Sequence, residues 1–252
     1  MTEWLETEST HYIFHYKKDS YAHKSINKIT EEQEQAILDI LGLFPVTLPR
    51  KISYWLCDTR EEIAELTNDE PTNGLFCWDD DDTDKVSLYA VYNEAMQCTG
   101  YHEETHAVTH FLNEPSSCAL SEGIAVFMDK TWWGVAIDLC THLYLLSGNY
   151  VSVESLICSQ ENGGDDFFWS VDCAFSYPIM GAFVGFLLNR DENGKNTFLN
   201  LYAYEGENWK EEIEKNYSCP LSELEAEFLH YINQKKYSEE EIRFGKDRLG
   251  LD

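Results

Sequence analysis

The sequence predicts an α+β protein in which a mixed strand-and-helix part precedes a mainly helical part. Short runs of aromatic and β-branched residues, typical of strands, occur before residue 92. Apolar residues at helical spacing dominate from about residue 98 onward. We therefore expect an N-terminal subdomain with a small sheet over residues 1–97 and a helical subdomain over residues 98–252.

The strands of the first part are predicted at 10–16, 51–57, 74–78 and 86–91. A helix is predicted at 25–41, where apolar residues recur every three or four positions, and a short helix begins after Asp58 and Thr59. The last two strands are joined by the acidic residues 79–85 and so predict a hairpin with a long connection. Because this connection lacks the glycine and the closing glutamate of a calcium loop, it favours a solvated turn.

The helices of the second part are predicted at 99–113, 119–131, 134–147, 173–189, 195–204, 207–216, 220–236 and 238–248. Residues 113–117 favour a turn between the first two of these helices. We expect these two helices to run antiparallel, with the small residues Gly123 and Ala125 allowing them to cross closely.

The chain carries 18 Lys and Arg residues against 46 Asp and Glu residues, which gives a formal net charge of −28. It has no basic stripe that could displace the counterions of a nucleic acid, and its charge disfavours anionic membranes. The N-terminal residues lack the features of a signal peptide, and no apolar run approaches the ~20 residues of a membrane span. We therefore expect a cytoplasmic protein with reduced cysteines and with neither nucleic acid nor membrane as a partner.

Residues His102 to His106 read His-Glu-Glu-Thr-His, an H-E-x-x-H motif inside a predicted helix. Two histidines at this spacing lie one turn apart on one face of a helix, so both imidazoles can reach a single metal ion. Glu103 is rotated off that line and could take a proton from a water on the ion. The alternative is a surface helix with polar residues on its wet side.

A catalytic zinc ion needs a third protein ligand and one open coordination position. Glu122, within the segment Glu-Gly-Ile-Ala at the start of the next predicted helix, is the expected third ligand. Alone, this residue is equally consistent with a carboxylate that stabilises the N-terminus of a helix. The pentapeptide upstream favours the ligand.

An H-E-x-x-H segment followed by E-G-x-A on the next helix resembles the gluzincin metallopeptidases, the thermolysin-like and aminopeptidase-like clan, and especially their compact peptidase MA-like members. The order of hairpin, motif helix and E-G-x-A helix matches over residues 74–130. The resemblance implies a zincin-like catalytic core with the active site between the two subdomains. It also implies one Zn²⁺ per chain, with His102, His106 and Glu122 as ligands and Glu103 as the general base.

The metzincins, another H-E-x-x-H group, match less well, because Leu112 stands where their third histidine belongs. A second segment that is similar to the gluzincins runs over residues 175–187 and contains Tyr177. In related enzymes such a tyrosine donates a hydrogen bond to the developing oxyanion, and the resemblance implies this catalytic role for Tyr177. The alternative is an interfacial tyrosine that caps a helix start beside Pro178.

Two further residues of the motif helix and one strand also have expected roles. We expect Glu104 to face solvent or a basic partner, and His110, about 12 Å along the helix axis from His102, to be a packing or supporting residue. Gluzincins bind an extended peptide along an edge strand, and either 74–78 or 85–91 could supply that edge.

The predicted function is therefore zinc-dependent hydrolysis of peptide bonds in a peptide or protein substrate. The alternative is a catalytically inactive gluzincin-like module that binds peptides or proteins. A third class, an acidic structural protein, requires the motif and Glu122 to coincide by chance.

Overall fold

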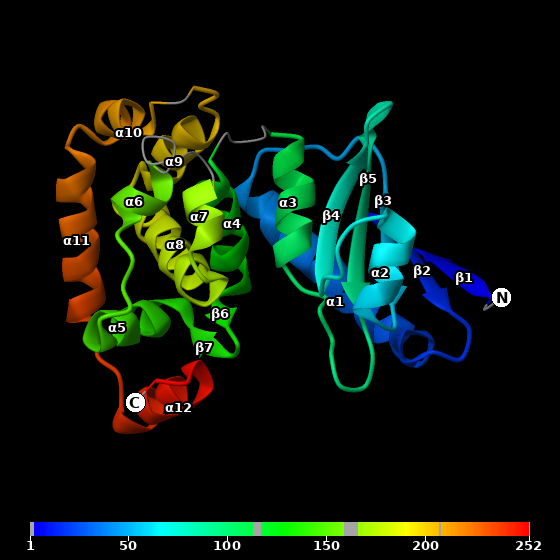
Figure 1. Ribbon diagram of the computed structural model, residues 1–252. Coiled ribbons are helices and arrows are strands. Elements are labelled where there is room, and N and C mark those ends of the chain that lie inside the picture. Colours follow the sequence, from blue (N-terminus) through cyan, green and yellow to red (C-terminus); the bar gives the residue numbers. More distant parts are fainter. Residues whose placement is uncertain (1–2, 113–116, 159–165, 207, 252) are drawn as a thin grey trace. The chain divides into compact units, whose positions relative to one another are not determined.

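The computed structural model describes residues 3–112, 117–158, 166–206 and 208–251. The protein has an α+β fold (Figure 1). The chain divides into two compact units, Met1–Leu112 and Asn113–Asp252, which we call the N-terminal and C-terminal units and describe separately. The predicted boundary after residue 97 assigned helix α3 (His102–His110) to the helical part, whereas its contacts assign it to the N-terminal unit. Residues 113–116 of the predicted turn lie outside the described residues.

The N-terminal unit is built on a mixed five-stranded sheet with the order β1-β2-β3-β5-β4. Its strands are β1 (Trp4–Glu8), β2 (Tyr12–Lys17), β3 (Ile52–Cys57), β4 (Gly74–Asp79) and β5 (Asp82–Val91). Strands β2, β3 and β5 run parallel, and β1 and β4 are each added antiparallel at one edge. Thus β5 is internal, and β4 is the edge strand of the hairpin.

The two faces of this sheet are covered by different helices. Helices α1 (Tyr21–Leu43) and α3 pack on one face, α1 against β2 and α3 against β4 and β5 (Figure 1). The strand residues that point to this face include the fully buried Tyr12, Phe14, Tyr54 and Leu88. On the other face, α2 (Arg60–Thr67) covers a smaller apolar cluster around Cys57, Ile63 and Val91.

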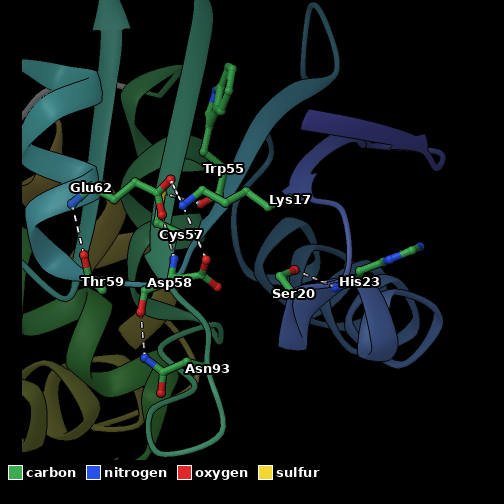
Figure 2. Close-up of polar contacts among 9 residues, drawn as sticks. All are labelled: Lys17, Ser20, His23, Trp55, Cys57, Asp58, Thr59, Glu62 and Asn93. Carbon is green, nitrogen blue, oxygen red and sulfur yellow. Dashed lines mark hydrogen bonds and ion pairs between the residues drawn. The ribbon is translucent and has the colours of Figure 1, made fainter. Parts of the chain in front are cut away.

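Polar side chains join the end of β2 to the turn between β3 and α2 (Figure 2). Lys17 forms ion pairs with Asp58 (3.4 Å) and with Glu62 of α2. The Glu62 carboxylate also accepts a hydrogen bond from the Asp58 N–H (2.9 Å), and the Asn93 side chain donates to the Asp58 carbonyl (2.7 Å). Partial burial lowers the pKa of Lys17, but the two carboxylates outweigh this effect and the pKa is raised. The cluster holds the start of α2 against the sheet.

The C-terminal unit is mainly helical. Its elements are α4 (Cys118–Asp129), β6 (Thr131–Trp132), β7 (Val135–Ala136), α5 (Ile137–Ser147), α6 (Val153–Ile157), α7 (Asp166–Ser170), α8 (Cys173–Leu188), α9 (Gly194–Tyr202), α10 (Trp209–Tyr217), α11 (Leu221–Gln234) and α12 (Glu239–Leu249). Glycines let α4 and α8 pack closely, since a Cβ on Gly181 would lie 2.7 Å from the Val126 side chain and one on Gly123 would lie 3.0 Å from the Met180 carbonyl oxygen. From the sequence we expected Gly123 to allow a close crossing with the motif helix α3. The helix that Gly123 contacts closely is α8.

The predicted strands and helices are present with shifted ends; the motif helix, for example, begins at His102 rather than at residue 99. Five further elements have no counterpart among the predicted ones, and none of them has more than five residues: β1, β6, β7, α6 and α7. Segments this short do not show a periodic pattern. Across the described ranges, no helix combines the length and apolar character needed to cross a membrane.

Candidate functional site

The H-E-x-x-H segment folds into α3, as the sequence predicted. The imidazole rings of His102 and His106 have their centroids 5.0 Å apart and their planes at 77°. Both side chains are half-buried. The two rings are therefore neighbours on one face of the helix, which is the arrangement that a shared metal ion requires.

Glu103 points from α3 toward the edge strand β4. A Cβ added to Gly74 would lie 2.6 Å from Oε1 of Glu103 and 3.2 Å from its Cδ. Burial raises the thiol pKa of Cys77 and Cys98, and the negative charge of Glu103 contributes to raising both. Glycine at position 74 thus leaves room for a carboxylate that a larger residue would push aside.

Aromatic side chains of β4 pack along the next turns of α3. The Phe76 ring lies 6.4 Å from the ring of His106 and 5.6 Å from that of His110, measured between centroids. Trp78 stacks on His110 at 5.2 Å and is 41% exposed. The Nε2 atom of His110 lies 3.1 Å from the Thr83 carbonyl oxygen, so His110 packs against the hairpin. The result is an aromatic row that leads from the motif to an exposed indole.

Glu104 does not face solvent, contrary to the sequence-based prediction. It is only 1% exposed, and its carboxylate accepts a hydrogen bond from the side-chain amide of Gln33 on α1 when that amide is oriented with its NH₂ group toward the oxygens of Glu104 and Gly100, which is the orientation that their acceptors require. Burial raises the pKa of Tyr12 and Tyr54, and the negative charge of Glu104 raises both further. The cause is helix geometry: when Glu103 faces β4, the next residue, about 100° further around the helix, faces the sheet core.

Glu122 lies in the C-terminal unit and is half-buried. Helix α4 begins at Cys118 with Ser117 as its cap, so Glu122 lies beyond the first turn. The helix dipole acts mainly on charges in the first turn. The alternative explanation of Glu122, a carboxylate that stabilises the N-terminus of its helix, is therefore weakened. The thiol pKa of Cys173, at the start of α8, is raised by burial, by Asp172 and also by Glu122.

Tyr177 lies inside α8 rather than at its start, and its ring is 5.4 Å from that of Trp132. The next residue, Pro178, has no N–H, so the Ala174 carbonyl lacks its helical donor. The Tyr144 hydroxyl donates a hydrogen bond to that carbonyl (2.7 Å). The helix therefore continues through the proline, and Tyr177 keeps a helical position.

Comparison with known proteins identifies no relative of this chain. No protein-family model, no curated protein and no solved structure matches it. The candidate site consequently rests on the chain's own chemistry and geometry. His102, Glu103 and His106 lie together on α3, while Glu122 and Tyr177 belong to the C-terminal unit.

Proposed function

We propose that the protein is a zinc-dependent metallopeptidase with one Zn²⁺ per chain, held by His102, His106 and Glu122. Two imidazoles and a carboxylate, each offering one ligand atom, are a donor set that could hold a metal ion. Catalytic zinc sites commonly use three such ligands and leave a fourth position open. The observation that carries the proposal is the pair of imidazoles on α3, whose centroids are 5.0 Å apart, with Glu103 between them in sequence.

The proposed reaction is hydrolysis of a peptide bond, in which water supplies the oxygen of the new carboxyl group. A bound zinc ion lowers the pKa of water and polarises the scissile carbonyl group. Glu103 accepts the proton of the attacking water and passes it to the leaving amine. Tyr177 donates a hydrogen bond to the carbonyl oxygen as negative charge develops there.

The edge strand β4 supports a peptide as the substrate. The sequence gives two candidates for the strand that binds the peptide, β4 and β5. Strand β5 has neighbours on both sides, whereas β4 lies at the edge of the sheet. An extended peptide can add to such an edge through backbone hydrogen bonds. Because Gly74 of β4 lies beside Glu103, a peptide on this edge would pass the proposed general base.

The metal site is tested by zinc content. We expect about one zinc per chain, and we expect Glu122→Ala to weaken zinc binding more than about 100-fold, because loss of a residue that only supports a ligand already costs 10- to 100-fold. Elemental analysis after dialysis and titration against a chelator measure both. Glu65→Ala, an exposed glutamate of α2, is the control and should bind zinc like the wild type. A wild-type chain that binds no zinc contradicts the proposal.

A substitution at Gly74 tests the position of Glu103. The added Cβ in Gly74→Ala would lie 2.6 Å from Oε1, so the carboxylate must move away from β4. We expect kcat to fall about 10- to 100-fold with zinc content unchanged, because small misplacements of a catalytic group have effects of this size. Steady-state kinetics with a fluorogenic peptide measure this. An unchanged kcat would show that Glu103 does not act from its place beside β4.

A further inference from the structure

Glu104 is a carboxyl group in a place where an apolar side chain would be expected. It is 1% exposed, and Ala107 and Val108, which share its face of α3, are fully buried. Glutamate is almost never fully buried without partners, because removing its charge from water is costly. Packing alone therefore does not account for this residue, and such conflicts between a residue and its environment are typical of functional positions.

The partners of Glu104 hold the beginning of α3 from the neighbouring helix α1. The amide of Gln33, which is 2% exposed, donates to the Glu104 carboxylate and to the Gly100 carbonyl (2.9 Å). The Tyr101 hydroxyl donates to Asp39 of α1 (2.8 Å). Tyr101 is also the N-cap of α3 and provides no side-chain capping bond. Side chains of α1 thus hold this end of the motif helix.

Helix geometry connects this attachment to the motif. Successive residues of a helix are about 100° apart, so Glu104 and the motif residues point in directions that are fixed relative to one another. Hydrophobic contact is non-directional and would tolerate a range of rotations of α3. A hydrogen bond tolerates only a narrow range of distance and angle. The bond between Glu104 and Gln33 therefore restricts the rotation of α3 about its axis.

We propose that Glu104 is a positioning residue, whose hydrogen bond to Gln33 orients α3 so that His102 and His106 can bind one zinc ion with Glu103 beside them. This inference rests on the proposed function. Residues that orient metal ligands typically contribute 10- to 100-fold to metal affinity, which gives the size of the expected effect.

The test separates positioning from stability by replacing both partners. The double variant Gln33→Leu/Glu104→Leu removes both members of the buried pair, so its free energy of unfolding should fall less than that of Glu104→Leu or Gln33→Leu alone. Its zinc affinity, measured by chelator competition, should nevertheless be 10- to 100-fold lower. The exchanged pair Gln33→Glu/Glu104→Gln restores the carboxylate–amide bond but not the bond to the Gly100 carbonyl, and it should recover part of the affinity. Zinc affinity equal to the wild type in the double leucine variant would overturn the inference.

A second readout does not require zinc. In the zinc-free protein, backbone amides of residues 103–110 should exchange with deuterium faster in the double leucine variant than in the wild type, and at an intermediate rate in the exchanged pair. Identical exchange in the wild type, the double leucine variant and the exchanged pair would overturn the inference. This outcome is separate from the test of the metal site, which fails if the wild type binds no zinc. If the leucine pair does not fold, Gln33→Met, which removes the amide donor and keeps the length of the side chain, takes its place, and unchanged zinc affinity and exchange would again overturn the inference.

The matched control is another buried carboxylate, Glu225 on α11, which is 8% exposed and belongs to the C-terminal unit. Glu225→Gln should lower the free energy of unfolding without changing zinc affinity. If Glu225→Gln weakens zinc binding as much as the Glu104 variants do, the effect is one of general stability and the positioning role is refuted.

Discussion

Replacing Glu103 with glutamine is expected to lower kcat by about 10²–10⁴-fold while zinc remains bound, which is the usual contribution of a general base. Glutamine has the same size as glutamate and fits beside Gly74, but its amide cannot accept the proton of the attacking water. The structure places Oε1 of Glu103 so close to Gly74 that a Cβ there would lie 2.6 Å away. Cleavage of a peptide library by zinc-loaded protein, together with elemental analysis, measures both quantities.

Glu65→Gln is the control for this experiment, because Glu65 is exposed on α2 of the same unit. It should cleave peptides at the wild-type rate. Equal activity of Glu103→Gln and the wild type would eliminate the proposed mechanism. A wild-type chain that binds peptides but cleaves none, with or without chelator, would instead favour the non-catalytic binding module.

Replacing Glu225 with glutamine is expected to lower the free energy of unfolding by about 2–4 kcal/mol, because hydrogen bonds to a buried charge contribute more than neutral ones. Its carboxylate accepts hydrogen bonds from the Tyr150 hydroxyl (2.6 Å), the Ser152 hydroxyl (3.0 Å) and the backbone N–H groups of Val153 (2.8 Å) and Glu154 (3.2 Å). In the glutamine variant, an NH₂ group would face donors instead of accepting from them.

Urea denaturation of the full chain, followed by circular dichroism, measures this loss. Glu223→Gln, two residues earlier on the same helix and exposed, should change the free energy of unfolding by less than about 0.5 kcal/mol. If Glu225→Gln were as stable as Glu223→Gln, the four hydrogen bonds would contribute nothing net, and Glu225 would no longer be a valid control for Glu104.

The fold class and the longer elements could be predicted because their apolar residues repeat at the spacing of helices or strands. The hairpin of β4 and β5 and the helices α3, α4 and α8 are examples. What could not be predicted depends on three-dimensional packing. Gly123 was assigned to a crossing with α3, but its neighbours are Met180 and Val184 of α8, far along the chain.

The burial of Glu104 was missed although a signal was present. Gln33 falls on the apolar stripe of α1, between the buried Ile29 and Ile37, and it is itself buried. Glu104 likewise falls four residues before the buried Val108. A polar residue on an apolar stripe of each of two neighbouring helices is a pattern that predicts a buried polar pair. The metal-site residues themselves remain a prediction from motif chemistry.

The position of β4 at the edge of its sheet has a consequence for how copies of this chain behave in solution. An edge strand that can accept a peptide can also accept the same strand of a second molecule, which is a common route to aggregation. A net charge of −28 on every molecule makes such an encounter repulsive at low ionic strength. Salt shortens the range of this repulsion. Colloidal stability should therefore decline as ionic strength rises, and dilute buffer is the condition that should best keep the molecules apart.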